Sequence, residues 1–465
     1  MSSKTTDRIY YEYTPSQKAT YLQLQYSIHK QVVQIPFYLL IDRKLDFDLL
    51  KKAVNVEIAR NDSLRLRYAK RNGKNVQYFV PPYGLDNIPV IDFSGKTMEE
   101  QDAFLSKDAG TPLRYRKGEV FRVILYRTHD GRTGIYLCVF HLNMDAMAVF
   151  QFFTDLMDVY VALKNGTELP PPLGSFEKGI KSDLASLQNT AKYEKDDKFY
   201  REFFLKDGKT FYAAPYGIDR LKKARLKKKD PGLGYLNIFD PIHDKSKNLR
   251  FHLSPERTAA FVKFCEDHQM SFQALIYLGL RTHLSKINDC TDDVYFHVIC
   301  NRRVTLADKR SGGCRMQALP LRTVIGKDMT FLDALAKVCR TQFAIYRHSD
   351  HPTRRIFDLV DELENRKAGS NTASMLFTCM PLSYTPPEDW KVEFGGYSTG
   401  RFSFPLYSFT VPSPVDGGLD FYFEFQTYRT SDQNITDLYN NAVKVIEAGI
   451  ADPHITIGEI LDRVL

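Results

Sequence analysis

One histidine of the chain stands where a general base could be held. His141 directly follows six apolar or aromatic residues, 135–140, and Asp145 comes four residues later. A neutral imidazole accepts a proton readily near neutral pH, because its unperturbed pKa is about 6.5. At the end of a buried strand such a base is both rigid and accessible. Taken alone, a single histidine after a strand is more often a packed or surface residue.

The stretches on either side of His141 predict the elements that would hold it. Residues 135–140 read as a buried strand, and Val120–Thr128 as its hairpin partner across the turn at Asp130-Gly131. A helix is predicted from Ala146 onward. Its apolar positions on one face are Met147, Phe150, Phe153, Met157 and Val161.

The composition is that of a globular protein with two or three domains. Of its 465 residues 43% are hydrophobic and 26% charged. The N-terminus has no apolar signal segment, and no apolar run reaches the roughly 18 residues of a membrane span. Seven cysteines without a CxxC pair predict reduced thiols, no metal site and a cytoplasmic location. The net charge of +8 permits an acidic partner without requiring nucleic acid.

Breaks in the pattern predict an N-terminal lobe at 1–175, a linker and basic crossover region at 176–245, and a C-terminal lobe at 246–465. Each half reads as strands and helices around one sheet, so the fold class is α/β or α+β. The densest positive charge lies between Arg220 and Lys229. This basic run is either a solvated loop or a binding surface. As a binding surface it would dock an acidic carrier protein or the phosphates of coenzyme A.

Several motifs together resemble one family. The stretch Phe140-His141-Leu-Asn-Met-Asp145-Ala146 is similar to the His-His-x-x-x-Asp-Gly motif of nonribosomal peptide synthetase condensation domains. Their superfamily also holds chloramphenicol acetyltransferase and the plant alcohol acyltransferases. The second histidine and the aspartate match, whereas Phe140 and Ala146 replace the first histidine and the glycine.

Other stretches extend the resemblance over nearly the whole chain, in the family's order. They are Arg60-Asn61 with Leu64-Arg65, the run from Asn301-Arg302-Arg303 through Gly313 to Arg322, His348-x-Asp350-x-Pro352 and, more loosely, Glu393-Phe394-Gly395. Asn61 stands where the family has a histidine.

The resemblance implies a fold and a role for each site residue. The fold would be two chloramphenicol-acetyltransferase-like lobes forming a V-shaped pseudo-dimer with a tunnel between them, and His141 would lie in that tunnel. Asp145 could orient the imidazole, as in a triad. The family's pattern instead pairs it with an arginine that fixes the loop. We favour this pairing and expect Arg303 as the partner, with Arg302 as the alternative.

The resemblance also implies a free-standing monomeric acyltransferase. It would move an acyl group from a phosphopantetheine thioester, on a carrier protein or coenzyme A, to the amine or hydroxyl of a small molecule. No tightly bound cofactor, metal or nucleic acid is expected, and the basic run would dock the carrier. One alternative is an inactive condensation fold that recruits a carrier or partner enzyme. The other is an alcohol O-acetyltransferase that uses acetyl-coenzyme A.

Overall fold

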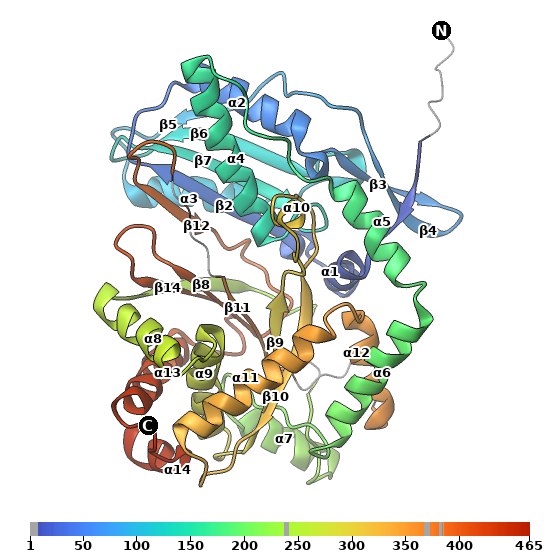
Figure 1. The fold of residues 1–465 in the computed structure, drawn as a ribbon, viewed down its shortest axis with the longest axis vertical. Coiled ribbons are helices and arrows are strands. Elements are labelled where there is room, and N and C mark those ends of the chain that lie inside the picture. The colour runs from blue at the N-terminus through green and yellow to red at the C-terminus, as the bar shows by residue number, and fades with distance from the viewer. Residues whose placement is uncertain (1–7, 237–240, 367–372, 381–383, 385) are drawn as a thin grey trace. The chain divides into compact units, whose positions relative to one another are not determined.

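The computed structural model describes residues 8–236, 241–366, 373–380, 384 and 386–465, and the chain divides into two compact units (Figure 1). Unit 1 comprises residues 1–189, 301–316 and 383–401, and unit 2 comprises 190–300, 317–382 and 402–465. Each unit has a hydrophobic core of its own. The fold class predicted from the sequence, mixed α/β, is confirmed.

This division differs from the predicted boundaries at 1–175, 176–245 and 246–465. Residues 176–189 belong to unit 1, and 190–245 carry helices of unit 2 rather than forming a separate linker. Two later segments, 301–316 and 383–401, also join unit 1. The reason is long-range pairing: β12 (Val392–Gly396) forms the edge of the unit 1 sheet by running antiparallel to β2 (Gln34–Ile41). In Figure 1 it appears as a strand from near the red end of the bar beside a blue one.

The main sheet of unit 1 holds the predicted hairpin at its centre. Its strand order is β12-β2-β7-β6-β5, where β7 is Thr133–Phe140, β6 is Phe121–Arg127 and β5 is Val90–Asp92. All eight residues of β7 are buried, as its unbroken apolar run predicts. His141 therefore directly follows the last residue of a buried central strand.

Helix α4 (Ala146–Asn165) begins where the sequence predicts. It packs against α2 (Phe47–Arg60) and β2. Its buried side is shifted from the predicted face. Phe153 and Met157 are buried as expected, but Met147, Phe150 and Val161 are only partly buried, and Phe152 and Leu156 are buried in addition. By length and composition alone α4 could cross a membrane, but 56% of its most apolar window is buried inside the protein. We interpret it as a core helix.

The remaining elements of unit 1 surround this core. A small sheet has the order β1-β4-β3. The Asp62 carboxylate caps the start of α5 by accepting hydrogen bonds from the backbone amides of Phe176 and Glu177. The bounds are β1 Tyr11–Glu12, α1 Pro15–Tyr26, η1 Lys30–Val33, η2 Asp62–Arg65, β3 Leu66–Arg71, β4 Lys74–Phe79, α3 Met98–Ala109, η3 Tyr115–Lys117, α5 Phe176–Ser186 and α10 Leu306–Lys309.

Unit 2 is built on a six-stranded sheet of order β10-β9-β11-β13-β14-β8. Helix α9 packs against α13 and α11 to cover it. The bounds are α6 Thr190–Leu205, α7 Asp219–Lys228, β8 Ser246–Leu253, α8 Pro255–Asp267, α9 Phe272–Ile287, β9 Asp293–Cys300, β10 Gln317–Val324, α11 Phe331–Arg347, α12 Thr353–Leu363, β11 Met375–Cys379, β13 Leu406–Pro412, β14 Leu419–Gln426, α13 Asp432–Ala451, α14 Ile457–Glu459 and η4 Ile460–Val464. The predicted basic run forms α7, and all seven cysteines are free thiols.

Candidate active site

The loop from His141 to Asp145 is fixed by hydrogen bonds to distant parts of unit 1. The His141 amide donates to the Val33 carbonyl at 2.8 Å. The Gln17 amide group donates to the Leu142 carbonyl at 3.0 Å. The Asn143 side chain donates to the Ser63 carbonyl at 2.7 Å. The loop connecting β7 to α4 is thus rigid, which is what the placement of a catalytic side chain requires.

His141 itself is partly exposed, but its Nδ1 atom is buried and has no hydrogen-bond partner among the residues that the structure describes. Withdrawal of the ring from water lowers the pKa of His141 below the ordinary 6.5, and the negative charge of Asp145 offsets part of that effect. The imidazole is therefore neutral at pH 7. A neutral imidazole can accept a proton.

Asp145 is buried, and donors other than His141 occupy both of its oxygens. Oδ1 accepts from the Ala148 amide at 3.0 Å and caps α4, where the helix dipole favours a negative charge. Oδ2 accepts from the Arg303 guanidinium at 2.8 Å and from the Arg315 and Met316 amides at 2.9 and 3.2 Å. Burial alone would raise the pKa of Asp145, but the Arg303 charge and these hydrogen bonds hold it below its usual range.

This arrangement selects between the two roles open for Asp145. No hydrogen bond joins its carboxylate to the His141 ring among the described residues, so it does not orient the imidazole as in a triad. The pair with Arg303, which the resemblance implies, is present in the structure. Its importance for activity stays a prediction.

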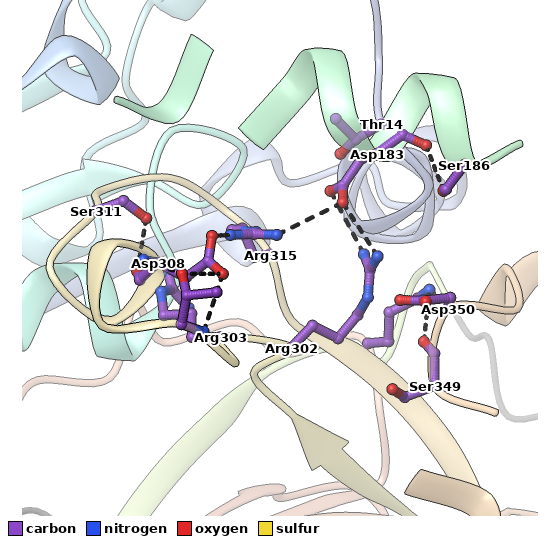
Figure 2. Close-up of polar contacts among 12 residues, drawn as sticks. Thr14, Asp183, Ser186, Arg302, Arg303, Asp308, Ser311, Arg315, Ser349 and Asp350 are labelled. Atoms are coloured by element: carbon purple, nitrogen blue, oxygen red, sulfur yellow. Dashed lines mark hydrogen bonds and ion pairs between the residues drawn. The ribbon is translucent and has the colours of Figure 1, made fainter. Parts of the chain in front are cut away.

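Arg302 and Arg303 are neighbours that reach different acids. Arg302 has a left-handed backbone, with φ of +53°, and its guanidinium donates to Asp183 of α5 at 3.1 Å. Arg315 lies 3.8 Å from the same carboxylate and also pairs with Asp308 (Figure 2). Arg302 is thus not the partner of Asp145. With Arg315, it fastens the segment 301–316 to α5 within unit 1.

Gly313 lies near the end of this segment and contacts both Arg303 and Asp145. Its carbonyl accepts from the Arg303 guanidinium at 2.9 Å and from the Asp145 amide at 3.3 Å. Its φ of +96° favours glycine, and a Cβ there would lie 2.0 Å from the Phe176 ring. The sequence marks this glycine through the family motif, whereas no local signal identifies Gln17, Asn143 or Asp183 as parts of the site.

The two departures from the family motif are accommodated differently. Phe140 is buried and stacks on Tyr115 with ring centroids 4.4 Å apart, and it meets the Tyr68 ring edge-on with centroids 5.3 Å apart. Ala146 is the first residue of α4 and is partly exposed. Neither residue disturbs the contacts of His141 or Asp145 described above.

Comparisons with known proteins identify a family for the N-terminal part of the chain. The model of the condensation domain matches residues 8–230. One component of the plipastatin synthase of Bacillus subtilis is 23% identical over 420 residues, which cover 90% of this chain and 15% of that protein. Residues 8–230 belong to the condensation-domain family. The resemblance inferred from the sequence is thereby confirmed. The chain therefore spans only a small part of that synthase subunit's length.

Solved structures show that the whole chain has the condensation-domain fold. The first condensation domain of the calcium-dependent antibiotic synthetase, in complex with a substrate analogue, aligns with a TM-score of 0.81 at 20% identity, covering 97% of this chain and 98% of that one. A variant of the starter condensation domain of rhizomide synthetase, in complex with C8-CoA, aligns with a TM-score of 0.80 at 16% identity, covering 97% and 96%.

Replacing Asp145 by alanine should destabilise the condensation domain by about 3–5 kcal/mol, because Arg303 would remain buried without its carboxylate. Urea denaturation measures this loss. The matched control is Asp358→Ala, which breaks the exposed pair with Arg354 and should cost less than about 1 kcal/mol. Equal losses in the two variants would show that the Asp145–Arg303 pair does not hold the segment 301–316.

Proposed function

We propose that this chain is an acyltransferase in which His141 is the general base. The observation that carries the proposal is the neutral imidazole at the end of β7, on a loop fixed by hydrogen bonds on both sides of it. His141 would take the proton of an amine or hydroxyl as that group attacks a thioester carbonyl. The new carbon–nitrogen or carbon–oxygen bond forms, the carbon–sulfur bond breaks, and the proton passes to the departing thiolate.

The donor we propose is an acyl group on phosphopantetheine, carried by a carrier protein or by coenzyme A. Two observations on similar proteins support this class: relatives are synthases of plipastatin and surfactin, and one structural neighbour is bound to C8-CoA. Holding donor and acceptor together supplies much of the acceleration in such a reaction. The free cysteine thiols of this chain support a cytoplasmic location, because thiols, including that of phosphopantetheine, stay reduced there.

Helix α7 is the surface we propose for an acidic carrier. Lys223 and Lys227 of α7 and Lys229, which directly follows it, are exposed, and Leu226 is 80% exposed among them. Lys222, in contrast, pairs with Asp289 at 2.8 Å, so its charge is already neutralised. An apolar side chain within a basic helix suits a protein with acidic residues around an apolar patch better than it suits a solvated loop.

An inactive module that recruits a carrier is the second candidate. The observation that favours it is the loss of two motif residues at Phe140 and Ala146. The intact hydrogen bonding of the His141–Asp145 loop favours catalysis instead. The experiments below separate the two.

Replacing His141 by alanine should lower the rate of acyl transfer by about 10²–10⁴-fold, because the general base is lost. The assay supplies octanoyl-coenzyme A or an octanoylated carrier protein, with a panel of amino acid thioesters and alcohols, and detects products by mass spectrometry. The melting temperature should stay within about 2 °C of wild type. His454→Ala, at an exposed histidine, is the control and should transfer at the wild-type rate. Wild-type turnover by the His141 variant, or no transfer by the wild-type protein with either donor, contradicts the proposal.

The rate should fall as the pH drops, with a midpoint below 6.5. Protonated imidazole cannot act as a base, and the lowered pKa of His141 keeps the ring neutral to a lower pH than an ordinary histidine. The pH profile of kcat/KM measures this midpoint in the free enzyme. An acid limb at or above pH 6.5 would show that another group, or an unperturbed histidine, controls the rate.

Reversing three charges on α7 and at its C-terminal end, with Lys223, Lys227 and Lys229 each changed to glutamate, should weaken carrier binding at least tenfold and flatten its salt dependence. Binding is measured by calorimetry with an acylated carrier protein at two salt concentrations. The matched control makes the same change at the exposed Lys70, Lys96 and Lys107 of unit 1. If both variants bind the carrier as wild type does, α7 is not the docking surface.

A further inference from the structure

Tyr68 of β3 contacts residues on both sides of His141. Its hydroxyl donates to the Asn143 side-chain oxygen at 2.8 Å. Its ring meets the Phe140 ring edge-on, with centroids 5.3 Å apart and planes at 76°. Tyr68 is 6% exposed, so both contacts are shielded from water. One side chain therefore touches the residue before His141 and the residue two places after it.

Asn143 uses its whole amide group in this arrangement. It is fully buried, and its nitrogen donates to the Ser63 carbonyl at 2.7 Å and to the Leu66 carbonyl at 3.3 Å. Its oxygen accepts from Tyr68. The loop is thereby joined to η2 and to both the backbone and a side chain of β3. A buried amide with every partner in place holds one orientation, because any rotation leaves polar atoms unpaired.

We propose that Tyr68 is a positioning residue for His141, acting through Phe140 and Asn143. The inference rests on the proposed function, since positioning matters only if the imidazole acts on a substrate. It adds to that proposal the residues that set the ring's position.

The proposal also gives a reason for the aromatic residue at 140. Phe140 meets Tyr68 on one side and stacks on Tyr115 on the other. Tyr115 lies edge-on to Tyr68 at 5.9 Å, which closes a three-ring cluster. A second histidine at this buried site would need hydrogen-bond partners, whereas a phenylalanine gains only from ring contacts. In this chain, ring packing therefore fixes the strand end that precedes the base.

Removing the Tyr68 hydroxyl with Tyr68→Phe tests the proposal. The ring contact with Phe140 stays, but the Asn143 oxygen loses its donor and the loop gains freedom. We expect kcat to fall about tenfold with KM unchanged, because a base displaced from its working geometry loses rate rather than binding. We also expect the titration of the His141 ring, followed by NMR with ¹⁵N-labelled histidine, to move up towards that of an ordinary histidine as water reaches the ring.

Tyr115→Phe is the matched control. It removes a hydroxyl from the same ring cluster, one that contacts the Arg116 side chain and not the loop. It should leave both kcat and the His141 titration unchanged. Asn143→Leu removes the other end of the same hydrogen bond, so its effect on the titration should not add to that of Tyr68→Phe.

Two results would overturn the positioning role. One is a Tyr68→Phe protein whose His141 titration matches wild type, even if its stability in urea falls, because the hydroxyl would then be structural only. The other is an equal shift in Tyr115→Phe. The NMR readout needs no turnover, so it decides this inference even if the wild-type protein transfers no acyl group and the proposed function fails.

Discussion

The structure of the site depends on one buried charge pair, Asp145 with Arg303. A carboxylate and a guanidinium taken out of water are stable only if each finds enough partners. Asp145 finds them in Arg303, two backbone amides of the segment 301–316 and the first turn of α4. These contacts join stretches that are far apart in the sequence. The contacts that compensate the Asp145 charge thus hold the segment 301–316 against the loop that carries His141.

The buried ion pair gives His141 and Asp145, four residues apart, different environments. His141, the proposed base, is partly exposed, while Asp145 is buried and makes no hydrogen bond to the imidazole among the described residues. Because the acid satisfies other donors, the histidine stays neutral without a carboxylate beside its ring. A base of lowered pKa suits proton removal from an amine or hydroxyl at neutral pH, whereas an imidazole held against a carboxylate would be protonated more readily.

Local sequence patterns predicted the centre of unit 1 well. The apolar run before His141 is β7, and the helix predicted from Ala146 begins at that residue, because both follow from periodicity over a few neighbours. The pairing of Arg303 with Asp145 came from the family motif. The motif spacing also favoured Arg303 over Arg302. The contact that Arg302 makes instead, with Asp183, was not predicted, because no local pattern gives the position of Asp183. The contributions of Gln17 and Asn143 were missed for the same reason, since both act through contacts distant in sequence.

The compact units differ from the predicted boundaries because β12 and the segment 301–316 belong to unit 1 although they come late in the chain. This order has a consequence for synthesis on the ribosome. When residue 230 leaves the exit tunnel, the sheet of unit 1 still lacks an edge strand and Asp145 still lacks its cation. A buried acid without compensation and an open sheet edge both favour association with other chains. Asp145 stays without its cation until residues 301–316 have been translated, and the sheet edge stays open until residues 383–401 have followed.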